Sequence, residues 1–135
     1  MTDNTINKEP STAVEKSCGN CGGCTAPNVP KLHTLFLGVT EDCNMRCRYC
    51  FVHHNPARMT LDTAMKALYF LLAGQDRGNP KTPNITFFGG EPTLEWDSVI
   101  VPIVKRGREL TDNKMTFSIT SNGILLNREK LEFMK

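Results

Sequence analysis

From residue 32 onward, segments with the composition of strands alternate with segments whose apolar residues recur at helical spacing. Residues 32–40, LHTLFLGVT, are rich in β-branched and aromatic side chains and are bounded by polar ones, which predicts a strand. Residues 61–72 carry apolar side chains at helical spacing, which predicts a helix with one apolar face. Thr60 is suited to cap the start of this helix, and Gly74 to end it.

The same alternation of strand and helix continues to the end of the chain. Residues 84–90, NITFFGG, and 115–123, MTFSITSNG, predict two further strands. A second helix is predicted from about residue 97 to residue 110, with Pro102 either kinking it or marking a late start. Asn127 is expected to cap a third helix. This order predicts an α/β fold built from βαβ units around a parallel sheet.

Residues 1–31 have a different composition from the rest of the chain. They are rich in Ser, Thr, Asn, Gly, Pro and charged residues and contain few large apolar side chains. Such a segment cannot bury enough surface to fold by itself. We therefore expect a flexible or metal-ordered arm over 1–31, followed by a domain over 32–135.

Length and charge narrow the class of protein. A chain of 135 residues suits one domain, and a net charge of +2 argues against a nucleic-acid or membrane partner. The polar N-terminal stretch has no secretory signal, and the longest apolar run, LYFLLA, is too short to span a bilayer. We therefore expect a cytoplasmic location, where six clustered cysteines are metal ligands rather than disulfides.

Three polar motifs follow the three predicted strands. A loop with Cys43, Cys47 and Cys50 follows the first strand, the tetrapeptide GGEP at 89–92 follows the second, and SNG with Asn122 ends the third. In parallel α/β sheets, ligands bind at the carboxyl ends of the strands. We therefore expect the three motifs to lie side by side.

Each motif suggests a chemistry and has a simpler reading. Three thiolates suit an iron–sulfur cluster or zinc, and in a four-iron cluster they leave one position open. Gly89 and Gly90 remove side chains where the backbone approaches a ligand, and Glu91 can accept from an ammonium group. The amide of Asn122 suits a carboxylate or a ribose. The simpler readings are a zinc site completed by His53 or His54, and ordinary turns at GGEP and SNG.

The C-x3-C-x2-C spacing of CNMRCRYC, taken with GGEPTL and TSNG, resembles the radical S-adenosylmethionine (SAM) superfamily. The resemblance covers residues 32–135 and is greatest to the branch that modifies peptides and proteins, including sulfatase-maturing enzymes. It implies that three βα units form the first half of a partial, TIM-like (β/α)6 barrel. We therefore expect a fragment of a larger enzyme that does not turn over substrate by itself.

The resemblance also implies how the cluster works. Cys43, Cys47 and Cys50 would hold a 4Fe–4S cluster, reduced by a partner such as flavodoxin or ferredoxin. One electron would cleave SAM to a 5′-deoxyadenosyl radical, which would take a hydrogen atom from a peptide or protein substrate. A role in cofactor biosynthesis stays open within the superfamily. Outside it, the alternatives are an iron–sulfur electron-transfer module and a zinc-stabilised binding module.

The resemblance assigns further residues to SAM. The GGE triplet at 89–91 would hold the methionine amino group, and Tyr49 and the backbone near Phe51 would contact the adenine. Asn122 would contact the ribose or the carboxylate. In the third strand, polar residues alternate with apolar ones, and we expect Ser118 and Thr120 to face the interior of the barrel.

A second cysteine triplet lies in the N-terminal arm. Cys18, Cys21 and Cys24 have the C-x2-C-x2-C spacing of the first three ligands in a ferredoxin-type run, but a fourth cysteine is missing. Two interpretations stay open: a second iron–sulfur cluster completed by another part of the protein, and a metal-free arm.

Overall fold

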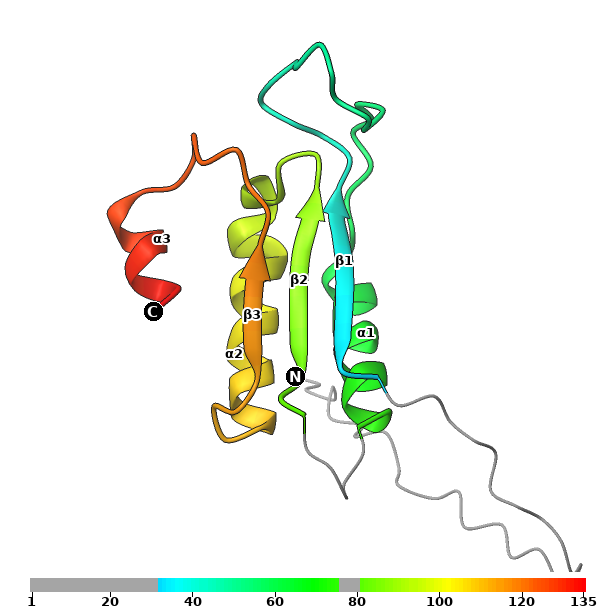
Figure 1. Ribbon diagram of the computed structural model, residues 1–135, viewed down its shortest axis with the longest axis vertical. Coiled ribbons are helices and arrows are strands. Elements are labelled where there is room, and N and C mark those ends of the chain that lie inside the picture. Colours follow the sequence, from blue (N-terminus) through cyan, green and yellow to red (C-terminus); the bar gives the residue numbers. More distant parts are fainter. Residues whose placement is uncertain (1–31, 76–80) are drawn as a thin grey trace, which may run out of the picture.

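The computed structural model describes residues 32–75 and 81–135, so the cysteine-bearing arm predicted over 1–31 lies outside the described residues. The strands β1 (Thr34–Thr40), β2 (Asn84–Gly89) and β3 (Thr116–Ile119) form one parallel sheet in the order β1-β2-β3 (Figure 1). The helices between and after them are α1 (Leu61–Ala73), α2 (Val101–Leu110) and α3 (Arg128–Phe133). The predicted α/β class, element order and parallel pairing are confirmed; closure into a barrel stays a prediction.

The strands are in register, so their carboxyl ends lie at one edge of the sheet. Asn84 of β2 pairs with Thr34 of β1 on one side and with Thr116 of β3 on the other. The cysteine loop leaves β1 at the upper edge in Figure 1, where β2 and β3 also end. Parallel pairing therefore places the segments that follow the three strands at the same end of the domain.

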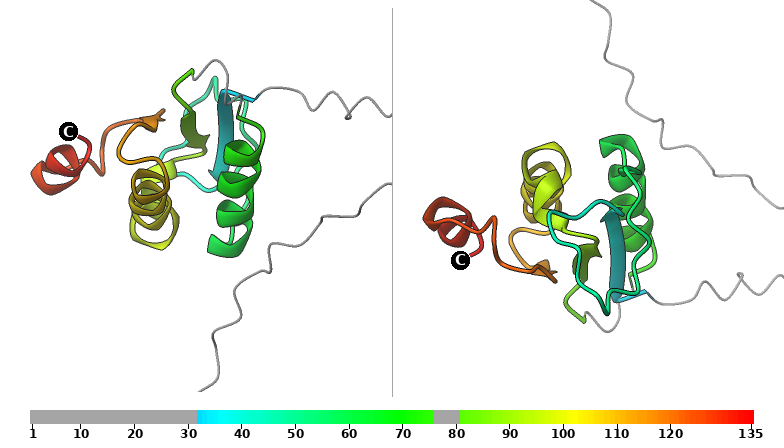
Figure 2. Two further views of the ribbon diagram at one scale, coloured as in Figure 1. Left: turned by 90° about the horizontal axis from the view of Figure 1, so that it is seen from below. Right: turned by 90° about the horizontal axis from the view of Figure 1, so that it is seen from above.

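Both long helices cover the same face of the sheet (Figure 2). The buried apolar residues between the sheet and these helices form one core: Leu37, Val39, Ala64, Leu68, Leu71, Ile85, Phe87, Trp96, Val99, Ile100, Ile103, Val104 and Met115. Alternate strand residues point to the other face, which no described helix covers. There Asn84 donates to the hydroxyls of Thr116 (3.0 Å) and Ser118 (3.4 Å).

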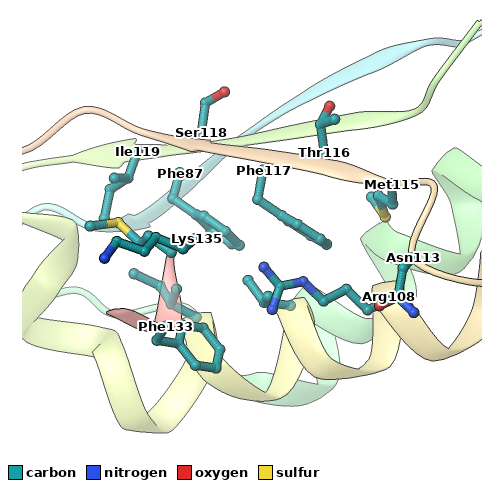
Figure 3. Close-up of a pocket in the computed structure, with 13 residues that line it drawn as sticks. Phe87, Arg108, Asn113, Met115, Thr116, Phe117, Ser118, Ile119, Phe133 and Lys135 are labelled. Carbon is teal, nitrogen blue, oxygen red and sulfur yellow. The ribbon is translucent and has the colours of Figure 1, made fainter. Parts of the chain in front are cut away.

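The predicted polar row of β3 lies on this helix-free face. Figure 3 shows Thr116 and Ser118 pointing away from α2, whereas Phe117 and Phe87 point toward it. The rings of Phe87 and Phe117 stack with their centroids 6.2 Å apart. Ser118 is thus on the side where the expectation for a barrel interior requires it.

The helix predicted over residues 97–110 begins with irregular turns. A 3₁₀ turn, η1 (Pro92–Glu95), and a π turn, η2 (Trp96–Ile100), precede α2. Pro102 lies in the first turn of α2 directly after the π turn, so the missing backbone N–H of proline falls where the helix changes from π to α hydrogen bonding. The prediction of a late start is confirmed for the α-helix, although the helical turns themselves begin ten residues before Pro102.

The predicted N-caps of α1 and α3 are confirmed. The Thr60 side chain accepts from the Thr63 N–H at 3.2 Å, and that of Asn127 accepts from the Lys130 N–H at 2.9 Å. β3 is shorter than predicted and ends at Ile119. Thr120 N still donates to Phe87 O of β2 at 2.9 Å, and the chain then leaves the sheet because Ser121 and Asn122 bond to the carboxylate of Glu91.

Within residues 32–75 and 81–135, no helix combines the length and apolar character needed to cross a membrane.

Replacement of Leu68 by Ala should lower the free energy of unfolding by about 2–5 kcal/mol, because the side chain is fully buried between α1 and the sheet. Urea unfolding followed by circular dichroism measures the loss. Leu61→Ala, on the same helix but partly exposed, is the matched control and should cost less than half as much. Equal losses for the two variants would contradict this core.

Candidate functional site

The cysteine loop is closed at its base. Its residues, 41–58, leave the sheet after β1 and return beside it before α1. Glu41 N donates to Ala57 O at 3.0 Å, Met59 N donates to Val39 O at 2.8 Å, and Thr40 forms an antiparallel bridge with Arg58. These contacts fix where the loop begins and ends, and leave residues 43–50 free of helix and strand.

The three cysteines of the loop are free thiols. Cys43 and Cys47 are half-buried and Cys50 is exposed, and a turn joins the last two through a 3.1 Å bond from Cys50 N to Cys47 O. Among the described residues, no group of three or more His, Cys, Asp or Glu converges on a metal position. The three thiols are soft donors whose chemistry fits an iron–sulfur cluster or zinc. In this structure they do not converge on one position, so the loop must rearrange to bring the sulfurs together.

The two aromatic residues of the loop project into solvent. Tyr49 is 90% exposed and Phe51 is 87% exposed. Large apolar side chains at such exposure have few contacts within the described chain, so both are available to a ligand or to another segment. His53 and His54 are also exposed, and the structure does not bring them to the cysteines as metal ligands.

Gly89 and Gly90 allow the end of β2 to dock on the start of the cysteine loop. Gly90 N donates to Thr40 O, and Glu91 N donates to Asp42 O, each at 2.8 Å. A Cβ atom on Gly89 would lie 2.1 Å from Thr40 O, and one on Gly90 would lie 2.1 Å from Asp42 O. Gly89 also has a φ of +138°, a backbone conformation that residues other than glycine rarely adopt. Both glycines are therefore required by backbone contact within the chain, whereas the sequence suggested contact with a ligand.

The carboxylate of Glu91 is fully buried and its hydrogen bonds stay within the described chain. Oε1 accepts from Thr93 N at 3.0 Å, from the Thr93 hydroxyl and from Ser121 Oγ at 2.8 Å. Oε2 accepts from Asn122 N at 2.8 Å. Burial by itself raises the pKa of Glu91, but the hydrogen bonds together outweigh it, so the pKa lies below its ordinary value. The side chain thus joins the end of β2 to the loop after β3.

Asn122 reaches the cysteine loop from the third strand. Its Nδ2 donates to Asn44 Oδ1 at 2.8 Å and lies 3.8 Å from Cys43 Sγ, while its Oδ1 accepts from Ile124 N at 3.0 Å. The expectation that the three motifs lie side by side is confirmed, because hydrogen bonds link GGE to the base of the cysteine loop and to SNG, and SNG to Cys43.

An ion-pair network that the sequence did not reveal ties the loop to the domain. Arg58 lies 3.7 Å from Asp42 Oδ2 and 2.9 Å from Oε1 of the buried Glu95. Asp42 in turn accepts from Cys43 N at 2.8 Å. Arg58 is about half exposed, so solvent screens its pairs, and their main effect is to orient the loop. No local signal marks these residues, since Arg58 and Glu95 meet only through the fold.

A groove lies on the other side of β3, among the residues that face α2 and α3 (Figure 3). Its volume is about 450 Å³, and its lining includes Phe87, Phe117, Met115, Arg108 and Phe133. The Arg108 guanidinium stands 5.6 Å from the centre of the Phe133 ring. The groove is on the helix-covered side of the sheet, and neither GGE, Asn122 nor the three cysteines line it.

A family model and the names of similar proteins point to the same family. Residues 37–135 match the family model described as the Radical SAM superfamily. A radical SAM cyclopropyl synthase from Paramaledivibacter caminithermalis is 26% identical over 119 residues, covering 78% of this chain and 25% of that protein. A GTP 3′,8-cyclase from Chlorobaculum tepidum is 36% identical over 95 residues, covering 69% of this chain and 26% of that protein.

A third relative is a 7,8-dihydro-6-hydroxymethylpterin dimethyltransferase from Methanocaldococcus jannaschii, 29% identical over 118 residues. The match covers 86% of this chain and 22% of that protein. The chain thus spans about a quarter of the length of the relatives that it matches.

Replacement of Glu91 by Gln should lower the free energy of unfolding at pH 7 by about 1.5–3 kcal/mol, because charge-assisted hydrogen bonds are lost in a buried site. The ionised carboxylate stabilises the fold fully above its ordinary pKa, and this contribution disappears as the pH falls through the lowered pKa of the folded state. The parent should therefore lose more stability on acidification than Glu91→Gln, as measured by urea unfolding at pH 7 and at stepwise lower pH.

The exposed Glu109 provides the control for this acid profile. Glu109→Gln should follow the parent at each pH, because solvent screens its pair with Arg106. Parallel acid profiles for the parent and Glu91→Gln would show that Glu91 does not stabilise the fold through its charge.

Proposed function

The chain belongs to the radical SAM superfamily, and we propose that it forms the cluster- and SAM-binding part of an enzyme that cleaves SAM reductively. The observation that carries this proposal is the set of hydrogen bonds that joins the three motifs at the ends of the parallel strands. An electron carrier needs no second and third motif beside its cysteines. A zinc-stabilised binding module would not need them either.

Cys43, Cys47 and Cys50 are the residues that we assign to a 4Fe–4S cluster. Their thiols lie on one eight-residue segment with no helix or strand, so the segment is able to adjust around a ligand. When bound, such a cluster supplies one electron to SAM, which is cleaved to methionine and a 5′-deoxyadenosyl radical that takes a hydrogen atom from the substrate. The chain's own residues supply position, orientation and shielding for this chemistry.

The residues around the loop fall into two groups in this proposal. Gly89, Gly90 and Glu91 set the loop in place through the contacts described above, and this triplet, of which the two glycines are partly exposed, is assigned to the methionine amino group of SAM. The Tyr49 ring is exposed and suited to stack on the adenine, and the backbone near Phe51 is assigned to the same base. Both assignments rest on the family resemblance together with this placement.

The helix-free face of the sheet is assigned to the interior of a partial barrel. This face carries the hydroxyl and amide groups of Ser118, Thr116 and Asn84, next to two exposed rings, Phe36 and Phe88, whose centroids lie 6.3 Å apart. Polar groups beside exposed aromatic rings are suited to hold a cofactor and a substrate. The remaining strands and the substrate contacts would come from other parts of the protein.

The proposed substrate is a peptide or a protein. The support is the resemblance of VTEDCNMRCRYCF, GGEPTL and TSNG to the peptide-modifying branch. Cofactor biosynthesis is the second candidate, and it is favoured by relatives named as a GTP cyclase and a pterin dimethyltransferase. Incubation of the full-length enzyme with a peptide library or with GTP, followed by mass spectrometry of the products, separates the two.

Replacement of Cys47 by Ala should abolish both the iron–sulfur absorption and the formation of 5′-deoxyadenosine. The full-length protein is reconstituted with iron and sulfide without oxygen, reduced with dithionite and supplied with SAM. His53→Ala on the same loop is the control: it should keep the cluster, whereas a zinc site completed by His53 would lose its metal. Parent protein with an intact cluster but no 5′-deoxyadenosine would refute the proposed function.

The cysteines of the arm call for a separate measurement. A second cluster held by Cys18, Cys21 and Cys24 predicts that their joint replacement by Ala lowers the iron content by about four atoms per chain. A metal-free arm predicts an unchanged iron content. Iron analysis of the full-length protein decides between these interpretations.

A further inference from the structure

We propose that Asn122 tunes the reduction potential of the cluster by donating a hydrogen bond from its side-chain amide to the sulfur of Cys43. This inference rests on the proposed function, because it requires Cys43 to be a cluster ligand. It gives Asn122 a role toward the metal centre, whereas the sequence assigned Asn122 to the ribose or carboxylate of SAM.

The sulfur of Cys43 already has two nitrogen donors beside it. Met45 N donates to Sγ at 3.4 Å from within the loop, and Asn122 Nδ2 donates at 3.8 Å from the end of the third strand. Sulfur is larger than oxygen, so its hydrogen bonds are correspondingly longer. Of these two donors, only the amide of Asn122 belongs to a side chain and is removable by substitution without changing the backbone.

Neighbouring hydrogen bonds determine which end of the Asn122 amide faces the sulfur. Oδ1 accepts from Ile124 N at 3.0 Å, and Nδ2 donates to Asn44 Oδ1 at 2.8 Å. The opposite orientation would place the Asn122 oxygen against the Asn44 oxygen and against the sulfur, and would leave Ile124 N facing an NH₂ group. The network therefore keeps the N–H groups of Asn122 directed at Cys43 and Asn44.

One buried residue holds both partners of this contact. The backbone N–H of Glu91 bonds to Asp42 O, next to Cys43, at 2.8 Å. The carboxylate of the same residue accepts from Asn122 N, also at 2.8 Å. Because Glu91 has no exposed surface, it forms a rigid connection between the cysteine loop and the loop after β3. The backbone next to this contact, at Asp42 and at Asn122, is thus held to the core of the domain, so the start of the loop keeps its place while the rest of the loop adjusts around a cluster.

The direction of the effect follows from charge. A cluster that accepts one electron from a low-potential donor becomes more negative, and no bond need form or break. An N–H group directed at a ligand sulfur stabilises the reduced state more than the oxidised state, and hydrogen bonds to the sulfurs are among the factors that set cluster potentials. Loss of the Asn122 donor should therefore make the cluster harder to reduce.

The test is a redox titration of the reconstituted full-length protein without SAM, followed by electron paramagnetic resonance. Asn122→Ala should lower the reduction equilibrium constant about threefold to tenfold, which is about 30 to 60 mV at 59 mV per factor of ten for one electron. Asn122→Asp keeps the Oδ acceptor for Ile124 N, removes the donor and adds a negative charge. It should therefore retain the turn and lower the potential further.

The matched control is Asn127→Asp, which adds the same charge at the cap of α3 and keeps the acceptor for Lys130 N. It should leave the potential at the parent value, and circular dichroism and iron content should match the parent in all variants. Unchanged potentials in both Asn122 variants would overturn the inference. So would a shift that occurs only when SAM is present, because it would assign Asn122 to SAM.

The inference and the proposed function fail in different ways. Normal 5′-deoxyadenosine formation with unchanged potentials would refute the inference alone. If the Asn122 variants show the expected shifts in potential but the parent forms no 5′-deoxyadenosine, the proposed function is refuted. The contact between Asn122 and the cluster would then still stand.

Discussion

The buried carboxylate of Glu91 is the interaction on which the candidate site depends. Burial of a charge is unfavourable unless hydrogen bonds compensate for it, and here Thr93, Ser121 and Asn122 supply the donors. Burial raises the pKa of Glu91, and the hydrogen bonds from these donors together lower it below its ordinary value. Because the donors come from two separate segments, the charge is stable only when η1 and the loop after β3 are both in place.

The glycines before Glu91 make that arrangement sterically possible. Without side chains at 89 and 90, the end of β2 approaches the backbone of Thr40 and Asp42 closely enough for direct hydrogen bonds. On the other side of the loop, Arg58 connects Asp42 to the buried Glu95. The cysteine segment between these anchors has fixed ends and an adaptable middle. That combination suits a loop which must position a ligand and also adjust around it.

Much of the fold could be predicted because it depends on local chemistry. The alternation of strand and helix patterns, the caps at Thr60 and Asn127, and the parallel pairing were all predictable from neighbouring residues. The short β3 and the irregular start of α2 were not. β3 ends early because Ser121 and Asn122 bond to a carboxylate about 30 residues away in the chain, which no local pattern encodes.

By itself, the sequence determined which chemical groups the site contains: three thiols, a carboxylate and an amide, together with two glycines. Each of these follows a strand of a parallel sheet. Only the tertiary structure decided what those groups contact. It directed Glu91 inward to the loop after β3, placed the glycines against backbone, and brought Asn122 to Cys43 across 79 residues. The physical reason is that spacing along a strand or helix fixes local geometry, whereas contacts between distant segments depend on sheet register and on the packing of the core.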